Sequence, residues 1–156
     1  MKIGQADERA LLEGMVDIQR DQIGSILDDL DDEEARRRLV PSLTTPLALV
    51  KHATFVEKVW FHARVAGVPR KEIGLPDTVA ESFLLDPEDT VESVRAAYRA
   101  ACERSREVAA GHELDEQFDW HGNPVTLRFV YVHMVQELAR HAGHGDILVE
   151  QIRAGR

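Results

Sequence analysis

The chain has almost no cysteine and contains no long hydrophobic run. Cys102 is the only cysteine among 156 residues, so no disulfide can form within the chain, which fits a reducing cytoplasm. No stretch reaches 18 consecutive apolar residues, which argues against a membrane-spanning helix. The N-terminus is polar and acidic and lacks the apolar core of a secretion signal. We therefore expect a cytoplasmic protein that does not enter a membrane.

Positive charge is also scarce. The sequence has 19 Lys and Arg against 28 Asp and Glu, which gives a net charge of −9. The one basic run, residues 36–38, directly follows the acidic residues 31–34, a pattern typical of a solvated helix face. Because such a balance repels a phosphate backbone, we expect no nucleic-acid partner.

Hydrophobic periodicity predicts helices along most of the chain. No segment alternates with the two-residue period of a half-buried strand, so a large sheet is not expected. The length suits one domain, residues 1–156. The predicted class is all-α, a four-helix bundle with two long connections, 67–86 and 111–125. The four long helices are predicted over about 7–30, 45–67, 86–110 and 126–152, with a short helical piece at 31–39 and a short hairpin over 119–125.

Each predicted helix has one face that should be buried. In the first helix, the spacing selects Leu11, Met15, Ile18, Gln22 and Ile26. In the second helix, His52 lies on the apolar stripe. In the third, Cys102 lies on the apolar face, where we expect a small buried hydrophobic residue and not a nucleophile.

The last helix carries the most informative pattern. Glu137 and His141 are four residues apart, so their side chains lie on one helix face, one turn from each other. His133 and His144 extend the same stripe. Four polar, metal-capable side chains are costly to bury without a compensating partner. The pattern therefore indicates a metal site.

A catalytic zinc ion typically has three protein ligands and an open position. His52 is the best candidate for the third ligand, which gives the set His52, Glu137 and His141 between two helices. No His-Glu-x-x-His motif is present, so the common zinc-protease arrangement is absent, and there are not two Glu-x-x-His motifs on separate helices for a di-iron centre. Two histidines and one carboxylate are also the ligands of the facial triad that binds Fe(II) in oxygenases, so the ligand types leave this alternative open. The competing interpretation pairs Glu137 with Arg128 or Arg140 at the surface.

The remaining histidines are expected to have ordinary roles. We assign His62, His112 and His121 to the surface or to loops. His133 is expected to pack beside the site. His144 is expected to support the ligands, held by Asp146, because a ligand histidine usually has a partner for its second ring nitrogen.

Taken together, a histidine in the second helix and Glu137-x-x-x-His141-Ala-Gly-His144 in the last helix resemble the DinB-like superfamily. Within it, the carboxylate at position 137 is similar to the branch that contains mycothiol-dependent maleylpyruvate isomerase. The isomerase of that branch carries an additional C-terminal domain, whereas this sequence ends just after its last predicted helix, so we do not expect isomerase activity itself.

The resemblance implies a divalent metal on His52, Glu137 and His141, usually Zn²⁺, with Ni²⁺ or Fe²⁺ as alternatives. It implies a low-molecular-weight thiol such as mycothiol as co-substrate, and a metal-dependent thiol S-transferase acting on an electrophilic small molecule.

Two other functions stay open. A non-catalytic metal-binding stress protein would close its site with His133 or His144, and a hydrolase using zinc-bound water would need a base, for which Glu57 and Asp146 are the candidates. A homodimer is also considered: Trp60, Phe61 and Trp120 would form its interface, or would instead fill the core or line a pocket. Loop 67–86 is expected to shape specificity.

Overall fold

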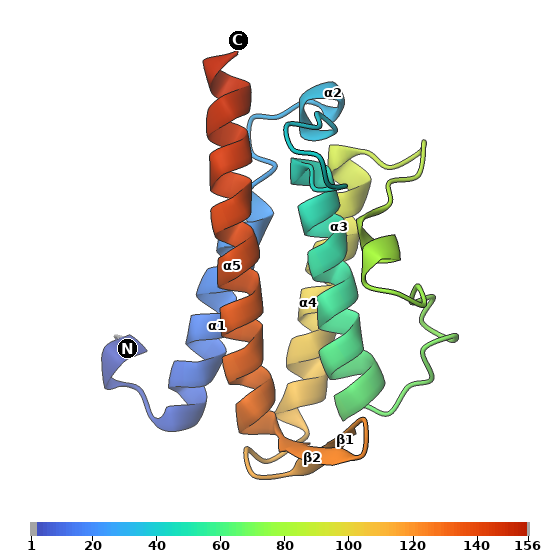
Figure 1. Ribbon diagram of the computed structural model, residues 1–156. Coiled ribbons are helices and arrows are strands. Elements are labelled where there is room, and N and C mark those ends of the chain that lie inside the picture. Colours follow the sequence, from blue (N-terminus) through green and yellow to red (C-terminus); the bar gives the residue numbers. More distant parts are fainter. Residues whose placement is uncertain (1–2, 156) are drawn as a thin grey trace.

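The computed structural model describes residues 3–155, so residues 1–2 and 156 of the predicted domain lie outside the described part. Helices make up 63% of the chain, which confirms the helical class that was predicted. Among the described residues, the long helices are α1 (Glu8–Ser25), α3 (Pro46–Glu57), α4 (Val91–Ala110) and α5 (Leu127–Ala154), and they run alongside one another (Figure 1). The short helix α2 (Asp32–Ala35) lies after α1.

The rotation of α1 about its axis differs from the prediction. Asp7 is the N-cap of α1, and its side chain accepts a hydrogen bond from the backbone N–H of Ala10. Leu11 and Ile18 are 37% and 42% exposed, whereas Val16 and Ile23 are fully buried. The predicted stripe was therefore wrong at Leu11, Ile18 and Gln22, whereas Ile26 is buried as predicted. The buried face of α1 also contains a charged residue, Arg20, which an apolar pattern does not select.

Helix α3 begins at Pro46, with Thr45 as its N-cap, as predicted. After Glu57 the helix continues as a π-helical segment, η2 (Lys58–Val65), and a residue with positive φ, Gly67, follows. The segment between η2 and α4 is not a plain loop, because it contains the 3-10 helix η3 (Ala80–Phe83). Helix α4 packs against both α3 and η2.

A hairpin of two short antiparallel strands, β1 (Gln117–Trp120) and β2 (Asn123–Thr126), precedes α5 and closes one end of the molecule (Figure 1). This confirms the hairpin predicted at that place. Helix α5 packs mainly against α1. A Cβ at Gly145 of α5 would collide with the side chain of Ile26, the residue that directly follows α1.

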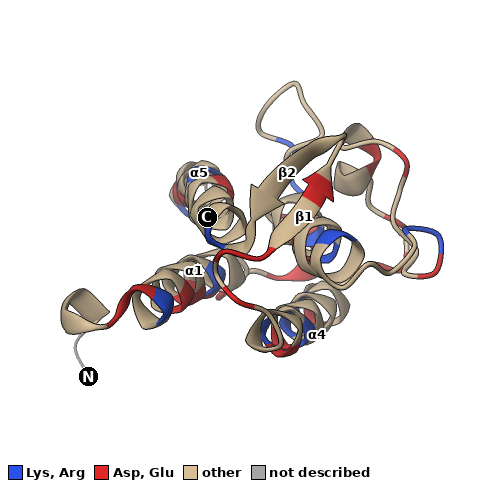
Figure 2. Cartoon of the chain, turned by 90° about the horizontal axis from the view of Figure 1, so that it is seen from below, with Lys and Arg blue, Asp and Glu red and all other residues tan. Residues whose placement is uncertain are grey.

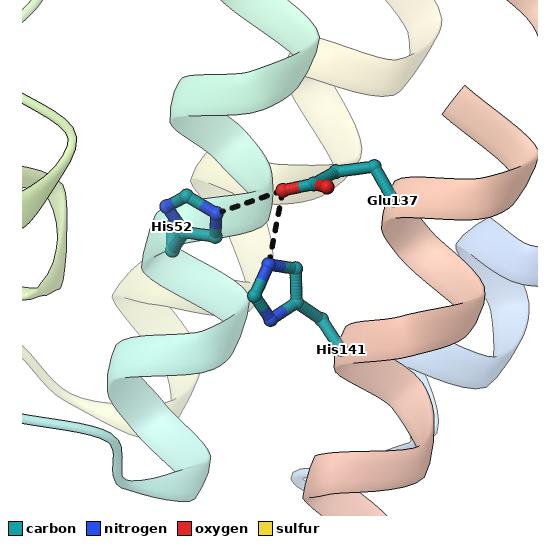
Figure 3. Close-up of side chains that lie close together, drawn as sticks. All are labelled: His52, Glu137 and His141. Carbon is teal, nitrogen blue, oxygen red and sulfur yellow. Dashed lines mark hydrogen bonds and ion pairs between the residues drawn. The ribbon is translucent and has the colours of Figure 1, made fainter. Parts of the chain in front are cut away.

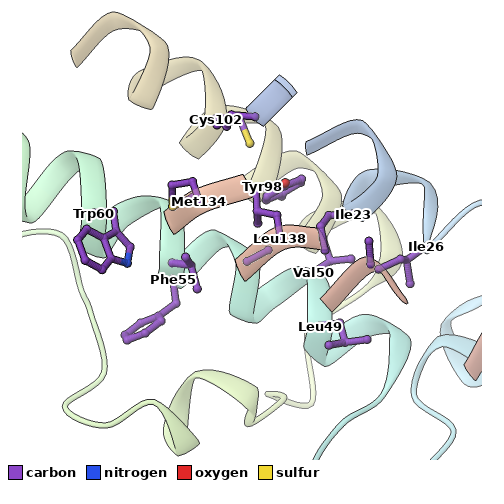
Figure 4. Packing of buried hydrophobic residues seen from close by; sticks show 14 of the residues in the cluster. Ile23, Ile26, Leu49, Val50, Phe55, Trp60, Tyr98, Cys102, Met134 and Leu138 are labelled. Carbon is purple, nitrogen blue, oxygen red and sulfur yellow. The ribbon is translucent and has the colours of Figure 1, made fainter. Parts of the chain in front are cut away.

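A single cluster of buried apolar residues fills the space between the helices; Figure 4 shows Ile23, Val50, Tyr98, Met134 and Leu138 from different helices meeting in it. Cys102 belongs to this cluster, as predicted, with 4% of its surface exposed. Acidic and basic residues both lie on the outer faces of α1 and α4 (Figure 2). Within residues 3–155, no helix is long and apolar enough to cross a membrane.

The aromatic residues considered for a dimer interface are not on the surface. Trp60 is 6% exposed and Phe61 is fully buried, and both pack in the core. Trp120 is half-buried and tilts against Trp60, with ring centroids 5.5 Å apart. The alternative, that these rings fill the core and line a pocket, is therefore confirmed for this part of the chain.

Candidate metal centre

Helices α3 and α5 bring His52, Glu137 and His141 together (Figure 3). The Oε1 atom of Glu137 lies 3.0 Å from Nε2 of His141 and 3.6 Å from Nε2 of His52. His52 is 2% exposed, and the side chains of Glu137 and His141 are 21% and 13% exposed. The surface pairing of Glu137 with an arginine is wrong, since its carboxylate faces the two histidines and Arg128 instead pairs with Glu8 and Asp115.

The ring of His52 is held on two sides by η3. Its Nδ1 atom lies 2.7 Å from Oγ of Ser82. The ring of Phe83 stacks on it, with centroids 4.1 Å apart and 14° between the planes. These contacts leave Nε2 of His52 buried, with no hydrogen-bond partner, and close to Glu137.

The electrostatics of Glu137 and His52 favour the metal-binding protonation states of these two groups. The hydrogen bond with His141 holds the pKa of the Glu137 carboxyl well below its usual range. Burial lowers the pKa of His52. At neutral pH the structure therefore presents a carboxylate beside an uncharged imidazole.

The donor set and its spacing fit a divalent cation. In a tetrahedral site with ligand bonds of about 2.1 Å, the donor atoms lie roughly 3.4 Å apart. The two distances from Glu137 lie on either side of this value, and one donor atom from each residue lies within 4.8 Å of the others. A cation would also give the buried Nε2 of His52 the partner that it otherwise lacks.

A pocket of about 810 Å³ reaches this cluster, and both His52 and Glu137 line it. Its walls come from η2, from the segment that follows η2, and from the hairpin. Trp60 and Trp120 supply aromatic surface, and the Arg64 guanidinium lies 3.9 Å from the centre of the Trp60 ring. This volume falls in the range of small-molecule sites, roughly 300 to 1,000 Å³.

A model of the mycothiol-S-transferase family matches residues 11–154. The chain belongs to this family. The family lies in the DinB-like superfamily of metal-dependent thiol transferases, so the relationship predicted from the helix patterns is confirmed. A search of curated proteins finds no match to the chain.

The other predicted residues lie beside the cluster and not in it. His133 lines the pocket and packs against Trp60, with ring centroids 4.3 Å apart. His144 is exposed and meets only the edge of the His141 ring, at 5.5 Å between centroids. Asp146 is exposed and makes no hydrogen bond or ion pair with His144 in the described chain, because residues two apart on a helix point in different directions.

His62 and His121 were both predicted to lie at the surface or in loops. His62 is not a surface residue: it is 7% exposed, and its Nε2 lies 3.1 Å from the carbonyl oxygen of Ala101 on α4. His121, which has a positive φ of 54° in the turn of the hairpin, lines the pocket.

Sequence reasoning missed the residues that hold His52. Ser82 and Phe83 lie in a stretch without hydrophobic periodicity, about 30 positions after His52, and neither residue type signals a metal site. Only the folding of this segment against α3 brings them to the histidine.

Proposed function

We propose that this protein is a metal-dependent mycothiol S-transferase in which His52, Glu137 and His141 hold a divalent metal. The ion that we propose is Zn²⁺. The reaction joins the thiol to an electrophilic small molecule that binds in the same pocket. The family supports the thiol chemistry, and the convergence of the three side chains at the pocket supports the metal.

The observation that carries the proposal is a three-residue donor set that faces an open pocket. Among the described residues, no fourth histidine, cysteine or carboxylate joins the group. Three protein donors with space for a further ligand are typical of catalytic zinc sites, whereas structural sites are closed by four. Two histidines and one carboxylate also suit Fe²⁺ and Ni²⁺, which remain the alternative ions.

A divalent cation in this site would lower the pKa of a bound thiol and keep it as the nucleophilic thiolate at neutral pH. The chain's own residues then have two tasks. His52, Glu137 and His141 would hold the cation, and the aromatic walls exclude water and orient the electrophile. The sulfur forms a bond to the electrophilic carbon, the thiol proton passes to solvent, and the leaving group departs with its electron pair.

The two other candidate functions have less support. Glu57, one candidate base for a hydrolase, is fully buried and paired with Arg20 at 2.8 Å, so it is not available to activate water. Asp146, the other candidate, is exposed and is not part of the donor group. A closed structural site would need His133 or His144 as a fourth ligand, and neither joins the group.

The proposal also includes the architecture: a single domain built as a four-helix bundle, with the metal between α3 and α5. Bundle interiors commonly hold metals on facing helices in this way. A homodimer stays a prediction that no longer has the support of exposed aromatic residues.

The test combines metal analysis with a conjugation assay. We expect the purified protein to contain about one equivalent of metal and to conjugate mycothiol, but not glutathione, to a chromogenic electrophile. His52→Ala should lose both metal and activity, while His112→Ala, a histidine outside the pocket, should keep both. Full metal content in His52→Ala would refute the site, and a fully loaded wild-type protein that conjugates no thiol would refute the reaction.

A further inference from the structure

We propose that Ser82 is a positioning residue for the metal centre: it fixes His52 in the tautomer that carries its proton on Nδ1, and so leaves the lone pair of Nε2 free for the cation. The inference rests on the proposed metal site and goes beyond it, because it assigns a function to η3, a segment that supplies no donor atom.

The direction of two hydrogen bonds decides the tautomer. The Ser82 hydroxyl has a single hydrogen, and its oxygen lies 2.5 Å from the backbone carbonyl of Val79, which can only accept. The Ser82 hydrogen therefore points to Val79, and the Ser82 oxygen faces Nδ1 of His52, 2.7 Å away, as an acceptor. Nδ1 must donate, so Nε2 is unprotonated.

The opposite tautomer would be unfavourable in this arrangement. With the proton on Nε2, the Ser82 hydroxyl would have to turn from Val79 to Nδ1, because otherwise Nδ1 and the Ser82 oxygen would be two acceptors 2.7 Å apart in a place where His52 and Ser82 are 2% and 4% exposed. Turning the hydroxyl would break the hydrogen bond of 2.5 Å that it donates to the Val79 carbonyl. The Phe83 ring, stacked on the imidazole, opposes rotation of His52 away from Ser82.

Removal of such a supporting partner typically weakens metal binding by about 10- to 100-fold. We therefore expect Ser82→Ala to raise the Kd for Zn²⁺ by roughly this factor, measured by competition with a chromophoric chelator. The melting temperature of the metal-free protein serves as the control for folding.

Thr78→Ala is the matched control variant. Its hydroxyl accepts a hydrogen bond from the Glu81 backbone at the start of the same segment and does not touch His52. If Ser82 acts through His52, Thr78→Ala should bind Zn²⁺ as the wild type does. If Zn²⁺ binding weakened equally in Ser82→Ala and Thr78→Ala, the cause would be a general loss of order around η3. That result would overturn the role assigned to Ser82.

Nitrogen-15 NMR of the histidine rings tests the tautomer without any variant. The wild-type metal-free protein should show His52 protonated on Nδ1, and the Zn²⁺ form should keep that proton while the Nε2 shift changes. A proton on Nε2 would refute the proposal. Wild-type protein that binds no metal would refute the proposed function instead, and unchanged Zn²⁺ affinity in Ser82→Ala would refute only the role of Ser82.

Discussion

Replacement of Glu57 by leucine should destabilise the protein strongly, because it removes the buried partner of Arg20 and leaves only Asp17, whose side chain is 42% exposed, to pair with it. Glu57 is fully buried and Arg20 is 5% exposed. Two parallel contacts of 2.8 Å join the guanidinium of Arg20 to the carboxylate of Glu57. Loss of one member of such a buried pair costs about 3–5 kcal/mol. For a chain of this size, roughly 2–4 °C per kcal/mol corresponds to a fall in melting temperature of about 6–20 °C.

The assay is thermal and urea unfolding, followed by circular dichroism at the helical band. Glu107→Ala is the matched control, because Glu107 pairs with Arg104 at a similar distance, 2.9 Å, but both side chains are more than half exposed. Exposed pairs contribute at most about 1 kcal/mol. The double variant Arg20→Met/Glu57→Leu removes both charges and should recover most of the loss. A loss below about 1 kcal/mol in Glu57→Leu would contradict the argument from burial.

Three further predictions concern the site and its scaffold. Burial lowers the pKa of His52 and the hydrogen bond with His141 lowers that of Glu137, so the deprotonated, metal-binding forms of these two groups persist as the pH falls. Bound Zn²⁺, followed by elemental analysis after dialysis, should therefore be retained to a lower pH than the usual histidine pKa of about 6.5 would allow, and loss of the metal above that pH would contradict this. Burial raises the pKa of Cys102 to about 12, so Cys102→Ala should keep the turnover number of thiol transfer, and a loss of activity with intact metal would contradict this. Gly145→Ala should destabilise the protein by up to about 2 kcal/mol through the α1–α5 contact, whereas Gly143→Ala, with open space around it, should be neutral or stabilising by up to about 1 kcal/mol in denaturant unfolding.

The donor set could be predicted because it lies on regular helices. Glu137 and His141 are joined by a spacing of one helical turn, and His52 lies on the apolar stripe of another helix, so helical periodicity alone brings all three to the interior. The same reasoning located the capping residues and the hairpin, since these depend on local sequence. Helix ends and turns favour particular residue types, such as Ser, Thr and Asp at N-caps and Gly, Asn and Pro in turns, which can be recognised in the sequence.

Other features depend on contacts between distant segments and have no local signal. The buried face of α1 contains Arg20 besides the apolar Val16 and Ile23, and Arg20 is paired there with Glu57, 37 positions away. The π-helical segment η2 follows directly from α3 with no proline or glycine within it to mark the change. The contact of Ser82 with His52 likewise exists only once the segment after η2 has folded back on α3.

These contacts explain how α3 holds His52 in place. His52 and Glu57 are five residues apart, so their side chains point about 140° apart around the helix. On one side, the ion pair with Arg20 joins α3 to α1. On the other side, His52 contacts Ser82 and Phe83 of η3 and faces the donors on α5. The helix is therefore anchored on two sides, within little more than one turn, by interactions that are both buried and directional. The hairpin supplies Trp120 and His121 to the pocket but no metal ligand, so these wall residues can change to suit a different electrophile without moving the metal ligands.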